Sequence, residues 1–166
     1  MSVPDLRIVA SSTDWLESFR ACIDQVAREK KYLLMSEGPP LAKLRAFIEG
    51  MERKQNPQFL ALVGDEVIGW SDLRRLDDRI TGELGMGVKD GYRGRGVGHA
   101  LLQACLKAAW DSGFDKVQLK VYLQNQRAID FYIAAGFRLE KRLKNFAKLD
   151  GVSLDAQQMY LRKEHA

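Results

Sequence analysis

Apolar residues recur at helical spacing in two segments of the first third of the chain. One segment begins near Asp14, which is followed three residues later by Glu17, a pattern typical of a helix start. The other follows Pro39–Pro40, and proline suits the first turn of a helix. The two apolar stripes are Leu16, Phe19, Ile23 and Val26, and then Leu41, Leu44, Ile48 and Met51. The pattern predicts two amphipathic helices, preceded by a short strand over Leu6–Ala10.

Three strands are predicted between residues 59 and 88. Phe59–Val63 and Val67–Leu73 flank Gly64-Asp65-Glu66, an arrangement typical of a β-hairpin. The third strand, Glu83–Val88, has two unlike faces. One face holds Leu84, Met86 and Val88, and the other holds Glu83, Gly85 and Gly87. Glycines inside a strand often mark either a bulge or the close approach of another group, and both interpretations are open for this strand.

The second half of the chain alternates between helices and strands. A helix is predicted from Val97 to Ser112, then a strand over Lys116–Tyr122 and a short helix from Asn125 to Ala135. The segments 137–149 and 152–161 surround Asp150-Gly151, a strong hairpin signal. The resulting order is β-α-α-β-β-β-α-β-α-β-β, without repeats or a visible boundary. The sequence therefore predicts one α/β domain over residues 1–166.

Composition and charge exclude several classes of protein. No apolar run approaches the roughly 18–20 residues of a membrane span, and the N-terminus lacks the features of a signal peptide. Cys22 and Cys105 are expected to be free buried thiols in a cytoplasmic protein, and with only two histidines we expect no metal site. The net charge of +4 comes from scattered basic residues, so we expect no nucleic-acid partner.

The segment GYRGRGVGHALL, residues 91–102, combines four glycines with two arginines before an apolar helix. The first amides of a helix are unpaired and the helix dipole is positive there, so this turn predicts a phosphate or pyrophosphate ligand. Neither the P-loop motif nor the dinucleotide-binding fingerprint fits the letters. The remaining motif is R-x-x-G-x-G, formed by Arg93, Gly96 and Gly98.

At this point the sequence resembles the GNAT superfamily of acyl-CoA-dependent N-acetyltransferases, whose signature is [Q/R]-x-x-G-x-[G/A] between a strand and a helix. The strand ELGMGV precedes the motif at the right place. The segment NQRAIDFYIAAGF supplies the family's Asn and, seven residues later, its Tyr. The closing hairpin is similar to that of the branch that acetylates small amines and amino acids. The resemblance is dense over residues 80–162 and rests on element order before them.

The resemblance implies a mixed, largely antiparallel central sheet with helices on both faces. It implies that an amine attacks acetyl-CoA, the cosubstrate, directly in a ternary complex, and a homodimer is possible. Main-chain groups of Met86 and Val88 are expected to pair with the pantetheine arm, and the turn is expected to bind the pyrophosphate. The expected cofactor-binding residues are Met86, Gly87, Val88, Arg93, Gly94, Arg95, Gly96, Val97, Gly98, His99, Asn125 and Tyr132.

Two residues are expected to be catalytic. Tyr132 matches the family's tyrosine, which implies that its phenol serves as the general acid for the leaving thiolate. Glu83 is the candidate general base, although our alignment places it one residue from the usual position. Some relatives carry the base on the next strand, where this chain has Lys120, and deprotonation through water is an alternative.

The acceptor is expected to be a small-molecule primary amine, with a free amino acid or small amine favoured over a protein N-terminus or lysine. Glu37 could hold a cationic amine, and Arg74–Arg75 could hold a carboxylate. Tyr32 and Met35 belong to the same expected acceptor region. A catalytically silent domain that binds acyl-CoA as a sensor or interaction module is the alternative from another class.

Overall fold

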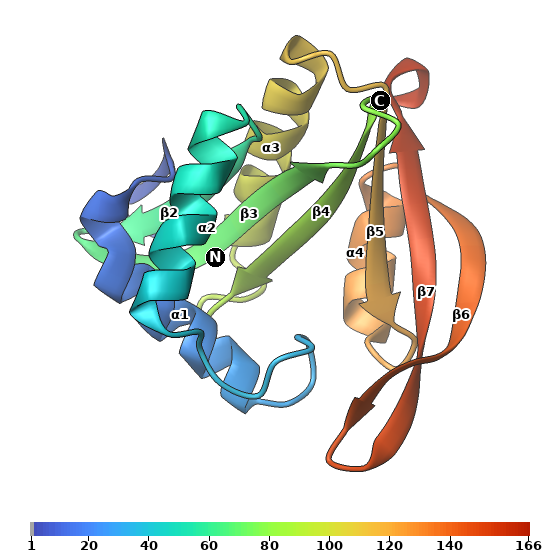
Figure 1. Ribbon diagram of the computed structural model, residues 1–166, viewed down its shortest axis with the longest axis horizontal. Helices are drawn as coiled ribbons and strands as arrows, with labels where there is room; N and C mark the ends of the chain where they lie inside the picture. The colour runs from blue at the N-terminus through green and yellow to red at the C-terminus, as the bar shows by residue number, and fades with distance from the viewer. Residues whose placement is uncertain (1) are drawn as a thin grey trace.

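The computed structural model describes residues 2–166 and is built around one seven-stranded sheet. The strands lie in the order β1-β2-β3-β4-β5-β7-β6, and every neighbouring pair is antiparallel except β4 and β5 (Figure 1). Their bounds are β1 Leu6–Ala10, β2 Gln58–Val63, β3 Glu66–Arg75, β4 Thr81–Val88, β5 Lys116–Tyr122, β6 Arg138–Leu149 and β7 Val152–Arg162. The expected mixed and largely antiparallel sheet is confirmed.

Helices cover both faces of the sheet, as expected. The four α-helices are α1 Leu16–Arg28, α2 Leu41–Arg53, α3 Val97–Asp111 and α4 Gln126–Ala134, and the 3₁₀ turns are η1 Thr13–Trp15 and η2 Lys163–His165. The apolar stripes of α1 and α2 pack on β2 and β3 around Phe19 and Trp70. On the opposite face, α3 and α4 enclose a core with β4, β5 and β7 that contains Leu102, Phe114 and Leu119. The sheet therefore separates two apolar layers.

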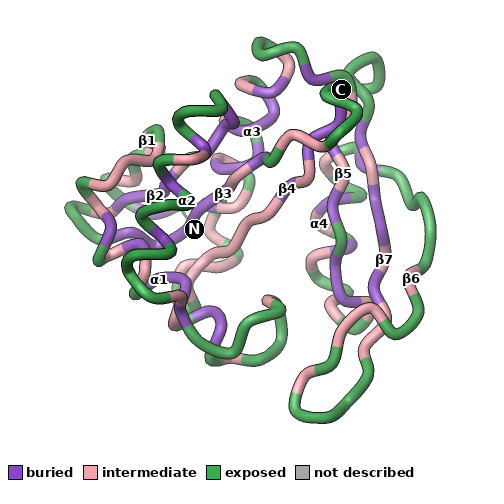
Figure 2. The backbone as a smooth tube through the Cα atoms, viewed as in Figure 1, coloured by how far each residue is buried: buried purple, intermediate pink, exposed green. Residues whose placement is uncertain are grey.

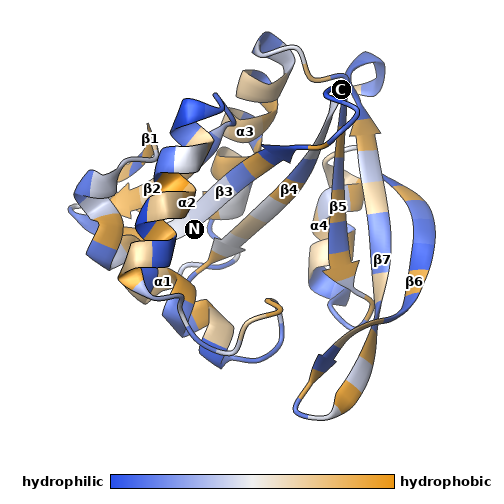
Figure 3. Ribbon diagram, in the orientation of Figure 1, coloured by the Kyte–Doolittle hydropathy of each residue, from blue (hydrophilic) through white to orange (hydrophobic). Residues whose placement is uncertain are grey.

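The α1/α2 layer covers only part of its face of the sheet. In Figure 1 these helices lie over β2 and β3, whereas β5, β7 and β6 carry no helix on that side. Figure 2 shows β3 as largely buried and β6 as largely exposed, and most of β6 is hydrophilic in Figure 3. Gln118, Lys120 and Gln158 project to this uncovered side, because Val117 and Leu119 turn into the opposite core. A polar surface therefore adjoins β4.

The parallel strands β4 and β5 pair over only three residues. Thr81, Gly82 and Glu83 lie opposite Lys116, Val117 and Gln118, and no further pair follows. Beyond Glu83 the two strands diverge, as Figure 1 shows, although both continue for several residues. We refer to this opening, between residues 84–88 of β4 and 119–122 of β5, as the split. It leaves main-chain groups inside a sheet without a strand to pair with.

The edges of the elements differ by a few residues from those predicted. Strand β4 begins at Thr81 rather than Glu83. Its start is fixed by Asp78, whose Oδ2 accepts a hydrogen bond from Thr81 Oγ1 at 2.6 Å. Gly82 is part of the strand, and it is a glycine because Leu73 fills the space above it: a Cβ there would lie 2.7 Å from Leu73 Cδ1. A glycine that is required by a side chain on a neighbouring strand cannot be assigned to a strand from the spacing of nearby residues.

Gly87 gives a test of this packing. A Cβ at Gly87 would lie 2.8 Å from Trp70 Cζ2, and Trp70 is itself held against Phe19. Gly87→Ala should therefore lower the free energy of unfolding by about 1–3 kcal/mol, as expected for overpacking. Gly50→Ala in α2 is the control, since the new methyl would meet only Arg53 Nη2 at 3.7 Å, and it should gain about 0.5–1 kcal/mol. Urea unfolding measures both, and equal effects would contradict this packing.

Candidate functional site

The glycine turn between β4 and α3 has the backbone that its sequence predicts. Gly91, Gly94 and Gly96 have φ values of 95°, 72° and 86°, which side-chain-bearing residues rarely adopt. Gly96 is the N-cap of α3 and has no side chain between the helix end and solvent. Gly98 differs, because its φ is ordinary and a Cβ there would make normal contacts. Three of the four glycines are thus required by the turn itself.

The amides of residues 93–99 are unpaired. Within residues 2–166, none of these N–H groups donates a hydrogen bond, and the first helical bond runs from Ala100 N to Gly96 O at 3.1 Å. They lie at the positive end of α3, a 15-residue helix. Arg127 at the start of α4 adds a guanidinium, whose Nη2 lies 2.8 Å from the position of a Cβ on Gly94. The turn therefore suits a pyrophosphate, and Arg127 is a further candidate ligand that the sequence analysis missed.

The side chain of Arg93 is committed to the protein. Its guanidinium forms a two-pronged ion pair with Glu29 at 2.8 and 2.6 Å and lies over the ring of Tyr32. This pairing raises the pKa of Arg93. Its Nε also donates to Val88 O at 2.8 Å. Arg93 therefore fastens the glycine turn to the end of α1, and its expected contact with the pyrophosphate is left to its main-chain amide.

The main-chain groups of β4 are arranged as the resemblance implies. A hydrogen bond from Lys89 N to Ile68 O, 2.9 Å long, sets the phase of the β3–β4 ladder. Since bonded pairs alternate along an antiparallel ladder, Met86 and Val88 turn their main-chain groups away from β3 and toward the split. The carbonyl of Val88 already accepts a hydrogen bond from Arg93. The N–H of Val88 and the N–H and C=O of Met86 are left for hydrogen bonds with an extended ligand. A pantetheine arm carries amides that fit such an edge.

The bare face of β4 is filled by side chains of β3. Trp70 covers Gly87, and Asp72 covers Gly85, with Asp72 Oδ1 3.1 Å from the position of a Cβ on Gly85. The expectation that this face is bare in order to admit the cofactor is therefore not the explanation for these glycines. The glycines make room for the indole of Trp70 and the carboxylate of Asp72.

Glu83 lies at the closed end of the split in a network of polar side chains. Its Oε2 accepts a hydrogen bond from Gln118 Nε2 at 2.6 Å, and its Oε1 lies 3.0 Å from Lys120 Nζ. The β3–β4 register contains no bulge, so Glu83 shares its face with Gly85 and Asp72. The lysine that departs from the family's pattern is thus the ion-pair partner of the candidate base.

Tyr132 lies in the core beneath the split. Its ring makes edge contacts with Phe131 and Phe137, and its exposed fraction is 9%. Burial raises the pKa of Tyr132 well above its usual range, so the phenol keeps its proton and can donate a hydrogen bond. Asn125 is the N-cap of α4, where its Oδ1 accepts from Ala128 N at 3.2 Å. His99 is exposed in the first turn of α3.

Asp72 is a candidate functional residue that the sequence analysis did not single out. It stands in β3 between the buried residues Ser71 and Leu73, and its carboxylate points to the α1/α2 side, over Gly85. Burial raises the pKa of Asp72 from 3.8 to about 7, with Arg74 lowering it in part. The signal was available, because Asp72 is the one charged residue in the apolar run VIGWSDL.

The expected acceptor residues have different surroundings. Arg74 is exposed on the face of Asp72 and forms no ion pair within the described part of the chain. Arg75 stacks on Phe114 at 3.8 Å and donates to the carbonyls of Arg79 and Ser112, so its role is structural. Glu37 is exposed and lies 3.5 Å from Arg28. Tyr32 and Met35 are exposed on the loop after α1, where Lys30 lies 3.4 Å from Asp150 at the β6–β7 turn.

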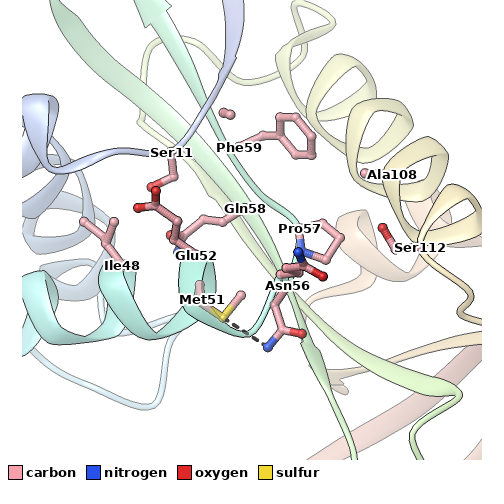
Figure 4. A pocket seen from close by; sticks show the side chains of 12 residues that line it. Ser11, Ile48, Met51, Glu52, Asn56, Pro57, Gln58, Phe59, Ala108 and Ser112 are labelled. Carbon is pink, nitrogen blue, oxygen red and sulfur yellow. Dashed lines mark hydrogen bonds between the residues drawn. The ribbon is translucent and has the colours of Figure 1, made fainter.

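Three further features lie outside this region or carry no chemistry there. A cavity of about 270 Å³ near the ends of α2 and α3 is lined by Ser11, Asn56 and Gln58 and contains none of the expected site residues (Figure 4). Burial raises the pKa of Cys105 to about 12, so it is no thiolate nucleophile at neutral pH. Over residues 2–166 there is no cluster of three metal-ligating side chains and no helix suited to span a membrane.

The comparisons with known proteins agree with this geometry. Residues 19–137 match the acetyltransferase (GNAT) family. The chain is 28% identical over 136 residues to an N-alpha-acetyltransferase of Sulfurisphaera tokodaii, covering 75% of this chain and 79% of that protein. Its fold matches a putative acetyltransferase of Salmonella typhimurium, solved with its cofactor acetyl-CoA, with a TM-score of 0.88, 19% identity and coverage of 97% and 96%.

A second solved structure extends the range of known ligands. It is the spermidine N-acetyltransferase of Vibrio cholerae in complex with CoA and spermine, matched with a TM-score of 0.83, 17% identity and 98% coverage of both chains. The matched family segment spans most of this chain, including the split and the glycine turn. The chain therefore belongs to the GNAT family and is an acetyl-CoA-dependent N-acetyltransferase.

Proposed function

We propose that this enzyme acetylates the primary amine of a free amino acid or a similarly small amine. The observation that carries the proposal is the exposed guanidinium of Arg74, which forms no ion pair with residues 2–166 and lies on the face of β3 that also holds Asp72. A cation two residues from a carboxylate on one face matches the carboxylate and ammonium groups of an amino acid. The uncovered polar side of β5 and β7 leaves space for the rest of a small molecule.

In this proposal the unpaired amides of residues 93–99 and the side chain of Arg127 bind the pyrophosphate. The edge of β4 at Met86 and Val88 aligns the pantetheine, which brings the thioester toward the closed end of the split. Acetyl-CoA supplies the acetyl group as an activated thioester. Asn125 positions the start of α4 and thereby Tyr132, and Tyr132 donates a hydrogen bond to the departing sulfur. A cytoplasmic location and a homodimer stay predictions.

The main alternative is a peptide N-terminus as acceptor, which the name of the Sulfurisphaera relative suggests. The long loop after α1 and the β6–β7 turn approach each other through Lys30 and Asp150, and this contact favours a short acceptor over an extended peptide. A polyamine, as in the Vibrio structure, lacks the carboxylate that Arg74 would bind. The three classes therefore differ in whether they can use Arg74.

Release of CoA thiol is the assay that separates these classes. The panel contains amino acids, their carboxamides, polyamines and short peptides, at saturating acetyl-CoA. Arg74→Gln should raise KM for the preferred amino acid by about tenfold or more, because a charge-assisted contact is lost, and leave the carboxamide unaffected. Faster reaction with peptides or polyamines than with any amino acid would contradict the proposed acceptor class.

The pyrophosphate assignment is tested with Gly96→Glu. The new carboxylate would face the bound anion, so the Kd for CoA should rise at least about tenfold, whereas acetyl-pantetheine, which lacks the pyrophosphate, should react at its wild-type rate. Gly113→Glu is the control, because Gly113 has a φ of 87° against 86° for Gly96, and neither position has an atom within 4 Å of a new Cβ. Equal losses in both variants would refute the assignment.

The role of Tyr132 is tested with Tyr132→Phe. Removing a hydrogen bond made to the leaving thiolate should lower kcat by about 10–100-fold while KM for acetyl-CoA stays within about twofold. The phenyl ring keeps the edge contacts with Phe131 and Phe137, so the melting temperature should be preserved. An unchanged kcat would remove Tyr132 from the mechanism.

A further inference from the structure

The carboxylate of Asp72 lies over β4, the strand that borders the split. Asp72 is opposite Gly85 in the β3–β4 register, and Oδ1 lies 3.1 Å from the position where Gly85 would carry a Cβ. Strand β4 is the strand that borders the split, and Gly85 comes two residues after the last β4–β5 pair. The side chain of Asp72 therefore extends across β4 toward the split, in the space that a glycine leaves free.

We propose that Asp72, rather than Glu83, accepts the proton of the acceptor amine and holds the ammonium group before transfer. The proposal rests on the function proposed above, and it adds a residue that is absent from the expected catalytic set. It assigns the acceptor a cationic primary amine that approaches from the α1/α2 side of the sheet. Gly85 is then a specificity feature, because any side chain there would separate this carboxylate from the split.

The two carboxylates of this face have opposite surroundings. Glu83 has an ammonium at 3.0 Å and an amide donor at 2.6 Å, so its negative charge is already compensated by Lys120 and Gln118. Asp72 receives no hydrogen bond from any residue between 2 and 166, and its surroundings include the indole of Trp70 and the backbone of β4. A desolvated carboxylate takes up a proton readily, which favours Asp72 as the base. Glu83 thus ties β4 to β5 at the closed end of the split.

The charged groups around Asp72 are few, which makes its titration interpretable. Arg74 of the same strand is the charged side chain that lowers its pKa, and it is exposed. On β4 the nearest acid is Glu83, which is paired with Lys120 of β5. On the other face of the sheet, the thiol of Cys105 in α3 has a pKa of about 12 and is neutral. Burial sets the pKa of Asp72 at about 7, which suits a base that works near neutral pH.

The proton balance of the reaction is complete with these groups. The ammonium of the acceptor gives one proton to Asp72, and the freed nitrogen lone pair forms the new C–N bond at the thioester carbonyl. The C–S bond then breaks, and the sulfur leaves with the electron pair while Tyr132 donates a hydrogen bond to it. The second nitrogen proton ends on the thiol, and Asp72 returns its proton to solvent. The products are the acetamide, the free thiol and one proton.

The kinetic test compares the pH profiles of kcat/KM for wild type, Asp72→Asn, Asp72→Glu and Glu83→Gln at saturating acetyl-CoA. Wild type should show a limb that rises with pH around an apparent pKa of about 7. The profiles are recorded with two acceptors whose ammonium pKa values differ by one unit. A limb caused by ionisation of the enzyme lies at the same pH for both acceptors, whereas a limb caused by ionisation of the acceptor shifts by one unit. Asp72→Asn should lose the limb and about 100-fold or more of kcat/KM, Asp72→Glu should keep a displaced limb, and Glu83→Gln should keep the limb unshifted.

A second readout needs no activity. Because the pKa of Asp72 is raised in the folded state, its protonated form is stabilised there, and that stability is present below pH 3.8 and is lost as the pH rises through about 7. Asp72→Asn carries no charge at any pH. Its melting temperature should therefore exceed that of wild type at pH 8, and this excess should shrink toward pH 4. The rise in melting temperature caused by CoA should be the same in both proteins.

The outcomes separate this inference from the proposed acceptor. The profiles are recorded with the acceptor that wild type acetylates fastest, so a peptide substrate would refute the amino-acid proposal and leave the test of Asp72 intact. An unchanged limb in Asp72→Asn, or loss of the limb in Glu83→Gln, would overturn the inference. A melting-temperature difference that is independent of pH would also overturn it, because it would show that Asp72 does not titrate in this range.

Discussion

The early end of β4–β5 pairing is the constraint on which the site depends. Three residue pairs hold the parallel strands together, and beyond them the sheet lacks its own hydrogen-bond partners. Unpaired main-chain groups inside a protein cost free energy unless a ligand or water binds them. The split therefore favours binding of an extended molecule that carries amide groups. The ion pair of Glu83 with Lys120 lies where the pairing stops. It joins the two strands at the closed end of the split.

The two halves of the active region follow from different elements. The pyrophosphate half is local, because three left-handed glycines and one helix N-terminus lie within a few residues of one another. The proposed acceptor half is assembled from β3, β4 and β5, which are separate segments of the chain. The glycine turn can keep its binding chemistry when residues elsewhere in the chain change. The acceptor region changes whenever the sequence of any one of these strands changes, which fits a family whose members acetylate different amines.

The sequence was sufficient for the order of the elements and for the glycine turn. Both depend on local spacing: the apolar stripes of α1 and α2, the strand-turn-helix motif and the cap at Asn125 are each contained in a short segment. The pairing of Arg93 with Glu29 and the position of Asp72 over Gly85 could not be predicted, because each depends on registers between distant segments. The role of Gly87 was misjudged for the same reason, since Trp70 lies on another strand.

The ion pair between Arg93 and Glu29 joins two loops of unlike purpose. Arg93 belongs to the turn that we expect to bind the pyrophosphate, and Glu29 is the C-cap of α1, just before the loop that includes Tyr32 and Met35. The loop that we expect to line the acceptor site is therefore anchored to the turn that we expect to bind acetyl-CoA. Residues 31–37 are therefore held at one end through Glu29 and at the other through Gly38, whose N–H donates to Asp24 Oδ1 at 2.8 Å. A loop transplanted from a relative should be held in place only in a chain that keeps Glu29.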